Sequence, residues 1–419
     1  MLSIVIITKD TKELLQQLLH SIEKDGPLKS SVKETIIIDN ASADGTGDMV
    51  HNEFPWAAYV RNDKNMGFAA SANQGIRQST GEYALLLNSD TVLIEGEIIK
   101  MIAFMETHVD VGICGPQLVY PDMRPQRSSA SIPSLLTEIL PFLVSRSSYL
   151  APHTSSTAPG IDNRSSIIDH RVSGHEQSAI GNRQSAISSQ QTASSNQQSA
   201  IGNLKSEIIS PLSALDVPSL IGAAIMIRRS LFEELSGFDE QFFFFLEETD
   251  LCLRAKQPSA SGIDNRSPII DHRVSGDLHN VEHRTLNIEP VSPPPASDSS
   301  LVPRPSYFGS PSSRVVLLPD VKVIHLQGKT VGKNWIKGRI EYNISLYKFI
   351  RKHHSALYYR SFQTMRFLKS IIVILVLSLL PFLLISKGTR RSYRYYRTLF
   401  LWHLSGCPPT AGLKDLATN

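Results

Sequence analysis

Residues 84–93, with the sequence ALLLNSDTVL, constrain the fold of this chain more than any other stretch. A short apolar run without helical spacing is typical of a strand buried on both faces of a mainly parallel sheet. Such a strand would carry Asn88 and Asp90 to the carboxyl edge of the sheet, where open α/β folds bind their ligands. Alternatively, Asp90 only caps an Asx-type turn that follows the strand. The flanking sequence favours a ligand-binding edge.

Composition excludes several classes of protein. The length of 419 residues allows one large or two ordinary domains. Because the formal net charge is only +3, we expect no nucleic-acid partner. Three scattered cysteines are too few for a disulfide framework or a cysteine metal site, which favours a reducing, cytosolic setting. The first residues, MLSIVIITKD, lack the features of a signal peptide and are expected to form the first strand.

Strand and helix patterns alternate along the N-terminal part of the chain. Residues 3–8 and 35–38 have the composition of buried strands, and residues 13–22 between them carry apolar side chains at helical spacing. This order predicts a βαβ unit with a right-handed crossover. Asp39 ends its strand as Asp90 ends the central one. The sequence therefore predicts an α/β fold with a mostly parallel sheet and carboxylates at strand ends.

Two long stretches do not continue this pattern. Residues 151–210 and 257–313 are rich in Ser, Asn, Gln and Pro, so we expect them to be disordered. They share a near-identical string, which is GIDNRSSIIDHRVSG at 160–174 and GIDNRSPIIDHRVSG at 262–276. Two separated copies do not make a solenoid. We interpret them as a repetitive element inserted twice into surface loops, and its His and Asp residues as solvated rather than metal-binding.

A second acidic cluster and a histidine lie at the ends of later elements. Glu247, Glu248 and Asp250 open a predicted helix beside an aromatic run, and His325 closes the last predicted strand. Asp90 and His325 could bind one cation, and a nearby carboxylate could act as a general base. The alternatives are acidic residues that merely favour a helix N-terminus, and a structural histidine.

Seven motifs then carry a family resemblance. They occur in the order SIVIITKD, IIIDNASADGT, RNDKNMGFAASANQGI, LLLNSDT, GAAIMIRR, GFDEQFFFFLEETDLCLRAK and VKVIHLQG. Together they resemble family 2 glycosyltransferases of the GT-A fold, and most of all the bacterial rhamnosyltransferase-like branch. The resemblance implies a nucleotide-sugar-binding half at 1–150, an acceptor and catalytic segment at 211–256 and the end of the GT-A domain at 314–360. A hydrophobic, basic-flanked membrane segment and tail would follow at 361–419.

The resemblance also implies a role for each matching residue. Donor binding would fall to Thr8, Asp39, Asp44, Asn65, Gly67, Asn73, Asn88 and Arg228. Asp90, with help from His325, would hold a divalent cation, either Mg²⁺ or Mn²⁺. Glu248 would be the catalytic base, with Glu247 as its rival and Asp250 in support. The chain departs from the family pattern in having Asn88 as the first DxD position and a Glu-Glu pair in place of Glu-Asp.

The implied reaction is an inverting transfer of a sugar from a nucleoside-diphosphate sugar to a glycan or lipid-linked acceptor in cell-surface polysaccharide synthesis, with rhamnose the candidate sugar in this branch. Two other interpretations stay open. One is a non-catalytic, membrane-attached binding or scaffold protein whose inserts disrupt the site. The other is a sugar nucleotidyltransferase, which would need a Gly-rich basic loop after the first strand, unlike the TKDT that begins at Thr8.

The C-terminal region predicts a location. Residues 371–385 are almost wholly apolar and lie between clusters of lysine and arginine. Spanning a bilayer takes about 20 apolar residues, so this length is marginal. Basic residues on both sides fit an in-plane or re-entrant segment at least as well as a single span. A core helix of a globular protein is the alternative. In the membrane-bound cases we expect the protein at the cytoplasmic face of the cell membrane.

Overall fold

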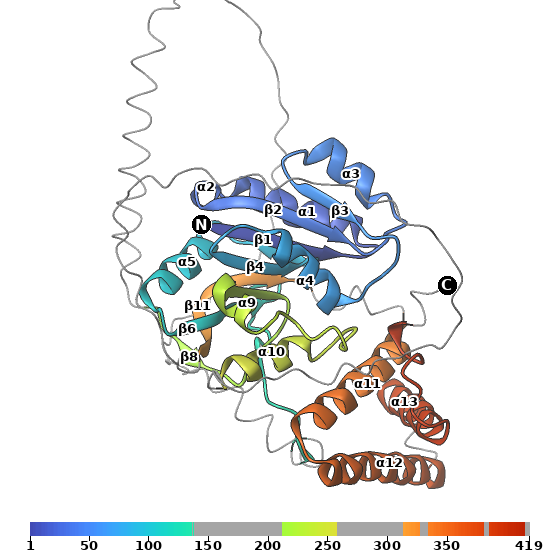
Figure 1. Ribbon diagram of the computed structural model, residues 1–419. Helices are drawn as coiled ribbons and strands as arrows, with labels where there is room; N and C mark the ends of the chain where they lie inside the picture. Colours follow the sequence, from blue (N-terminus) through green and yellow to red (C-terminus); the bar gives the residue numbers. More distant parts are fainter. Residues whose placement is uncertain (136, 138–211, 258–312, 327–333, 381–384, 415–419) are drawn as a thin grey trace, which may run out of the picture. The chain divides into compact units, whose positions relative to one another are not determined.

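The computed structural model describes residues 1–135, 137, 212–257, 313–326, 334–380 and 385–414 (Figure 1). The two inserts expected to be disordered, 151–210 and 257–313, lie outside the described residues except for Gln257 and Ser313 at the ends of the second.

The N-terminal half of the sheet is parallel. Its strands are β1 (Leu2–Thr8), β2 (Val32–Asp39), β3 (Ala58–Arg61) and β4 (Tyr83–Asn88). They lie in the order β3-β2-β1-β4, and each neighbouring pair runs in the same direction. The connecting helices are α1 (Lys12–Lys24), α2 (Gly26–Lys29), α3 (Thr46–Glu53) and α4 (Phe68–Gln78). This half therefore has the βαβ organisation that the sequence predicts.

The second half makes the sheet mixed. It contains β5 (Thr91–Leu93), α5 (Glu97–Thr107), β6 (Val111–Val119), β7 (Ser129–Ala130), β8 (Leu215–Asp216), β9 (Ser219–Leu220), β10 (Ala224–Arg228), α9 (Arg229–Glu234), α10 (Glu247–Ala255) and β11 (Arg314–His325). The main sheet has nine strands in the order β3-β2-β1-β4-β10-β6-β11-β5, with β8 paired to β11 (Figure 1). Strand β10 runs antiparallel to both β4 and β6. The α/β class is confirmed, but the sheet is less uniformly parallel than the sequence suggests.

Apolar residues on both faces of the sheet form two separate cores. In β1, Ile4 and Ile6 belong to the core that includes α1, while Val5 and Ile7 belong to the core that includes α4. Successive side chains of a strand point to opposite faces, so an uninterrupted apolar run serves both layers. The polar residues at the strand ends are left at the sheet edge.

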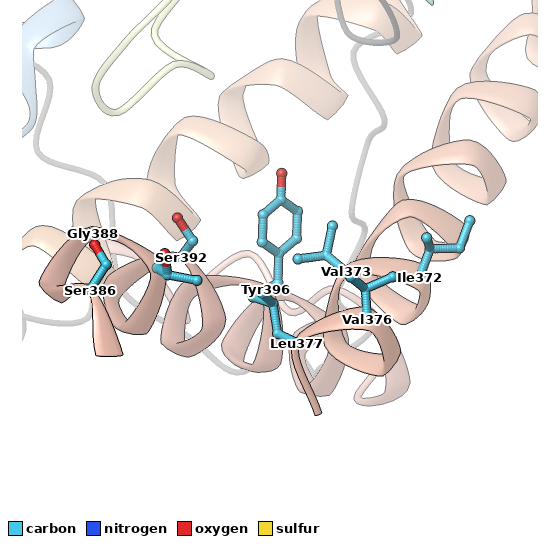
Figure 2. Close-up of a pocket in the computed structure, with 9 residues that line it drawn as sticks. Ile372, Val373, Val376, Leu377, Ser386, Gly388, Ser392 and Tyr396 are labelled. Atoms are coloured by element: carbon cyan, nitrogen blue, oxygen red, sulfur yellow. The ribbon is translucent and has the colours of Figure 1, made fainter. Parts of the chain in front are cut away.

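Three helices follow the sheet. They are α11 (Trp335–His353), α12 (Ala356–Leu379) and α13 (Lys387–Leu404). The stacked pair Phe367–Phe400, and the contact of Ser378 with Tyr393, show that α12 and α13 pack antiparallel. A groove of about 520 Å³ lies between these two helices (Figure 2).

Helix α12 includes only part of the apolar segment predicted at 371–385. It extends from Ala356 to Leu379, and residues 381–384 lie outside the described part of the chain. The residue before a proline is disfavoured in the helical conformation, which accounts for the helix ending before Pro381. Among the described residues, α12 is the one helix long and apolar enough to cross a membrane.

Candidate active site

The ends of the parallel strands bring several predicted residues to one edge. Thr8 is paired with Asp39 across β1 and β2, and Ile7 is paired with Asn88 across β1 and β4. The hydroxyls of Thr8 and Thr11 lie 2.9 Å apart, and Thr11 contacts Ser89 at 2.7 Å. These hydrogen bonds connect the loop after β1 to the loop after β4.

Asp39 is fully buried, and both of its carboxylate oxygens are engaged. Oδ1 accepts a hydrogen bond of 2.8 Å from the Ser42 amide, and Oδ2 accepts one from the Tyr59 hydroxyl. Burial and the Asp39 carboxylate together raise the pKa of Tyr59, so its hydroxyl keeps its proton as a donor. Asp39 therefore has a fixed orientation at the sheet edge.

Asp44 lies at the surface of the same loop region. Its carboxylate accepts hydrogen bonds from the Lys12 amide at 2.9 Å and from the hydroxyl of Thr46 at 2.5 Å. Partial burial acts to raise the pKa of Asp44, but these hydrogen bonds outweigh it and lower the pKa. The side chain thus joins the start of α1 to the start of α3.

The loop before α4 packs against the aromatic run that precedes α10. Gly67 has a φ of +85°, and a Cβ built on it would lie 2.6 Å from the carbonyl oxygen of Phe243. Both the backbone conformation and the close approach of Phe243 therefore require glycine at this position. The Asn65 side chain accepts a 3.0 Å hydrogen bond from the Gly67 amide. Asn73 donates to the Phe238 carbonyl at 2.9 Å and accepts from the Phe238 amide at 2.8 Å. Gly67 and Asn73 therefore position the segment that leads to α10.

Asp90 and His325, distant in sequence, lie beside each other. Nε2 of His325 is 3.5 Å from Oδ1 of Asp90, and both side chains are buried. The Gln126 amide donates to the His325 carbonyl at 2.6 Å, which leaves its Oε1 to accept from Nδ1 of His325 at 3.1 Å. With its proton on Nδ1, a neutral His325 presents the lone pair of Nε2 beside the carboxylate.

This pair fits a divalent cation. A carboxylate oxygen and an imidazole nitrogen held by a second hydrogen bond are a common combination at metal sites. Within the described ranges, no cluster of three or more His, Cys, Asp or Glu side chains could hold a metal ion. A cation at Asp90 and His325 would therefore take its remaining ligands from a bound substrate or water.

The two glutamates at the start of α10 sit on a strained turn. Phe245 and Leu246 have φ values of 72° and 66°, in the region that disfavours side chains with a Cβ. Such residues cost about 1–3 kcal/mol each and persist where the surrounding structure holds them. Glu248 lies beside Gly222, whose added Cβ would be 3.7 Å from Cγ of Glu248. The next residue, Ala223, accepts a 2.9 Å hydrogen bond from the Asn88 amide, so Glu248 is near the end of β4.

Glu247 and Glu248 interact, and the pKa of each is raised. Burial and the charge of Glu248 raise the pKa of Glu247 well above its ordinary value, and Glu341 of α11 adds to this effect. Burial also raises the pKa of Glu248, to about 7, but the hydrogen bond with Glu247 opposes the shift. Oε2 of Glu247 is buried without a hydrogen-bond partner. The arrangement keeps the proton on Glu247 and leaves Glu248 the readily ionised member of the pair.

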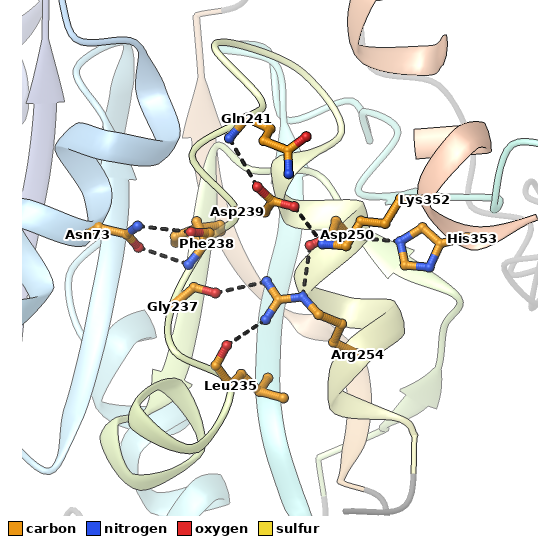
Figure 3. A network of polar contacts seen from close by, with 10 residues as sticks. All are labelled: Asn73, Leu235, Gly237, Phe238, Asp239, Gln241, Asp250, Arg254, Lys352 and His353. Carbon is orange, nitrogen blue, oxygen red and sulfur yellow. Dashed lines mark hydrogen bonds and ion pairs between the residues drawn. The ribbon is translucent and has the colours of Figure 1, made fainter. Parts of the chain in front are cut away.

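Asp250 belongs to a separate network of ion pairs (Figure 3). Its carboxylate contacts Arg254 at 2.8 Å, Lys352 at 2.8 Å and His353 at 2.7 Å. Although full burial acts to raise the pKa of Asp250, these partners lower it to about 2. Arg254 also donates to the carbonyls of Leu235 and Gly237 at 2.7 and 2.8 Å. Asp250 thus connects α10 to α11 instead of facing the sheet edge with Glu248.

Arg228 is not brought to this edge. Because β10 runs antiparallel to β4, its last residue is paired with Tyr83, the first residue of β4. The guanidinium donates to the carbonyls of Val111 and His108 at 2.8 and 3.0 Å. The donor-binding role expected of Arg228 therefore has no geometric support, because strand direction places the side chain at the far edge.

Residues that the sequence analysis passed over also organise the site. Gln126 sets the tautomer of His325, and nothing in its local sequence indicates this role. Oδ1 of Asn40 accepts from the hydroxyl of Ser71 at 2.7 Å and from Asn62 at 3.1 Å. Asn40 directly follows Asp39 in the motif at the end of the strand, and this position is the one feature of the sequence that indicates a role for Asn40 in the site.

Comparisons with known proteins extend this picture. Residues 3–160 match the model of glycosyl transferase family 2. An uncharacterized glycosyltransferase of Haemophilus influenzae is 30% identical over 111 residues, which are 26% of this chain and 36% of that protein. Poly-beta-1,6-N-acetyl-D-glucosamine synthase of Staphylococcus aureus is 35% identical over 71 residues, 16% of each chain. This chain therefore spans about a third of the length of the first curated relative and about a sixth of the second.

Solved structures give weaker similarities. The S. aureus TarS 1-349 structure has a TM-score of 0.34 and 16% identity, covering 60% of this chain and 55% of that one. The mannosyltransferase PcManGT from Pyrobaculum calidifontis, in complex with GDP-Man and Mn²⁺, has a TM-score of 0.45 and 12% identity, covering 96% of this chain and 87% of that one.

The family match agrees with the observed sheet and its flanking helices, and the predicted GT-A fold class is confirmed. The match does not distinguish the rhamnosyltransferase-like branch from the rest of the family. Residues 3–160 of this chain are therefore similar in sequence to glycosyl transferase family 2 domains.

Proposed function

We propose that this chain transfers a sugar from a nucleoside-diphosphate sugar to a hydroxyl group of its acceptor, with inversion at the anomeric carbon. The observation that carries the proposal is the meeting of two groups at the carboxyl end of β4. One is the Asp90–His325 pair, 3.5 Å apart. The other is Glu248, beside Gly222. A diphosphate site and a base next to each other are what inverting transfer requires.

The strand-end residues would hold the donor. Asp39 and Thr8 lie at the ends of adjacent strands, a suitable place for the nucleoside of a donor that binds along this edge. Asp90 and His325 lie next along the edge and would hold a divalent cation, Mg²⁺ or Mn²⁺, together with the diphosphate. When bound, such a cation would stabilise the negative charge that grows on the leaving diphosphate.

Glu248 would act as the general base. As the acceptor oxygen attacks, the Glu248 carboxylate takes the hydroxyl proton, and a base whose pKa is near the working pH suits this step. Glu247 keeps its own proton and donates a hydrogen bond to Glu248, which holds the carboxylate in place. The fixed positions of Gly67 and Phe243 would keep the strained turn before α10 from relaxing.

The wider role is also a proposal. The curated relative in S. aureus is a poly-beta-1,6-N-acetyl-D-glucosamine synthase, a polysaccharide-forming enzyme by its name. We place this chain in cell-surface polysaccharide synthesis, at the cytoplasmic face of the membrane, with a glycan or lipid-linked acceptor. The resemblance of its motifs to the rhamnosyltransferase-like branch makes a rhamnose donor the first to test.

The test uses the purified full-length chain and a panel of nucleoside-diphosphate sugars with Mg²⁺ or Mn²⁺. We expect one donor to raise the thermal midpoint and to be slowly hydrolysed, with release of the nucleoside diphosphate. Asp90→Asn and His325→Ala should lower this turnover by about a hundredfold or more. Asp122→Asn, in an exposed ion pair outside the site, is the matched control and should retain full activity. No stabilisation and no turnover with any donor would instead support a non-catalytic binding protein.

A further inference from the structure

Helix α12 buries polar side chains and exposes apolar ones, which is the reverse of the pattern expected in a soluble protein. Its buried residues are Phe362, Arg366, Ser370 and Leu377. The Arg366 guanidinium faces inward, where it donates to the side chain of Asn343 and to the Tyr395 hydroxyl. A helix that packs on a soluble domain normally buries its apolar side chains and exposes its polar ones. Here polar groups occupy part of the buried face.

The opposite face of α12 is an exposed apolar stripe, which we define as Leu368, Ile372, Leu375 and Leu379. These residues are 50%, 59%, 54% and 77% exposed. Their spacing of four, three and four positions places them on one side of the helix, roughly opposite Arg366 and Ser370. A continuous exposed stripe of this kind marks an interaction surface.

Charge indicates what covers the stripe. From residue 342 to residue 414 the chain contains twelve lysines and arginines and no aspartate or glutamate. On α13, Lys387, Arg391, Arg394 and Arg397 are exposed. A basic surface joined to an apolar stripe is complementary to an anionic lipid surface, which offers negative headgroups next to acyl chains.

The packing of α13 against α12 indicates whether α12 lies in the membrane interface or crosses the bilayer. Because α13 runs antiparallel along α12, its arginines lie beside the apolar half of α12. If α12 crossed the bilayer, these exposed arginines would enter the hydrocarbon region, where charged side chains are strongly disfavoured. An in-plane position leaves the α13 arginines at the level of the headgroups.

We propose that α12 and α13 form a monotopic anchor that inserts the apolar stripe into an anionic membrane leaflet without spanning it. The groove between the helices has an apolar wall formed by Ile372, Val373 and Val376 of α12 (Figure 2). It offers room for part of one acyl chain. Through His353 and Lys352 of α11, which pair with Asp250 of α10, the anchor is connected to the helix that carries Glu248. The anchor would hold the catalytic edge close to the membrane.

The test is sedimentation of the full-length chain with vesicles of phosphatidylcholine alone or with added phosphatidylglycerol. We expect binding to the anionic vesicles and little to the neutral ones. Because each inserted leucine removes apolar surface from water, Leu375→Asp with Leu379→Asp should lower the bound fraction about tenfold or more. Arg394→Gln with Arg397→Gln should lower binding to anionic vesicles about fivefold per charge and reduce its salt dependence.

Val109→Asp is the matched control, because Val109 is 76% exposed but lies outside the stripe, between α5 and β6. It should bind vesicles as the unchanged chain does. Circular dichroism and thermal melting of every variant separate loss of binding from loss of fold. Equal vesicle binding by the stripe variant and the unchanged chain would overturn the proposal.

Two further readouts distinguish other uses of the stripe. The Leu379→Cys variant, in a chain with Cys407→Ser, should react with a membrane-impermeant maleimide from outside only after detergent is added, and never from the vesicle interior. Reaction from the vesicle interior would mean a spanning helix. A dimer in solution that Leu375→Asp abolishes would mean a second copy covers the stripe. The anchor rests on the membrane location in the proposed function. Vesicle binding is measured without any sugar donor, so a failure of sugar transfer and a failure of the anchor are distinguishable.

Discussion

Glu247 and Glu248 differ in what surrounds them, although they are adjacent in sequence. Glu247 is buried against the charge of its neighbour and of Glu341, and its pKa is raised furthest. Glu248 borders Gly222, where the absence of a side chain leaves space beside the carboxylate. The structure therefore favours Glu248 as the base and Glu247 as the proton-bearing partner. The sequence alone left them as rivals.

We predict that Glu248→Gln lowers acceptor turnover by about a thousandfold, because general bases contribute about 10²–10⁴ to rate. Glu247→Gln is the matched control. Glutamine resembles a protonated glutamate and can still donate to Glu248, so turnover should fall by about tenfold or less. Steady-state rates with saturating donor measure both variants. If Glu247→Gln were the more damaging substitution, the two roles would be exchanged.

The pH dependence of the reaction follows from the same pair. Only ionised Glu248 can accept a proton, and burial raises its pKa to about 7. We therefore expect kcat/KM to rise as pH increases through about 7, and to level off above it. A profile from pH 5 to about pH 9 in one buffer series would measure this limb. A flat profile across neutrality would exclude a base with this pKa.

At the scale of the elements, Asp250 ties α10 to α11. A carboxyl group whose pKa is lower in the folded chain stabilises the fold above its unfolded pKa and loses this effect as pH falls. For Asp250 the ordinary pKa is 3.8 and the folded pKa about 2, so the stabilisation is present above about pH 4 and disappears toward pH 2.

We predict that Asp250→Asn lowers the free energy of unfolding by about 3 kcal/mol at pH 7, because it removes the buried carboxylate that pairs with Arg254 and Lys352. Lys352 keeps a second anionic partner, Asp239, at 2.6 Å. The loss should shrink in acid. Urea unfolding of both chains at pH 7 and pH 3 measures the difference. Asp122→Asn, in an exposed pair, should leave the midpoint unchanged. A loss that does not depend on pH would contradict the assigned ion pairs.

At the scale of the whole molecule, the described residues that flank the second insert lie close together. The Ser313 amide donates a 2.9 Å hydrogen bond to the Ala255 carbonyl, so the two ends of the second insert are neighbours. The first insert lies between β7 and β9, in which Ala130 is paired with Ser219. A short linker could therefore join Gln257 to Ser313 without moving the sheet.

We predict that replacing residues 151–210 and 258–312 with short Gly-Ser linkers leaves the chain folded and its donor binding unchanged. Thermal midpoint and donor affinity of the shortened chain measure this outcome. Replacing residues 242–245 with the same linker is a control that should fail, because Phe243 packs against Gly67 and Phe242 lies in the core next to α11. Loss of soluble folded protein on removing the inserts would show that they belong to the fold.

Local patterns in the sequence determined the strands, the βαβ order and the polar residues at the strand ends. Apolar runs and helical spacing show which side chains of an element must be buried, and this requirement does not depend on which partner covers them. The same patterns predicted Asp39, Asn88 and Asp90 at one edge, since parallel strands end together. That part of the candidate site could be predicted from the sequence.

Only the tertiary structure decided which distant elements meet and in which direction they run. Local sequence does not encode strand direction, so Arg228 could not be placed at the far edge before β10 was seen to be antiparallel. Two partners of Asp250, Lys352 and His353, lie on α11, beyond the second insert. The periodicity of α12 is the same whichever face is covered, and its packing alone left the apolar stripe exposed.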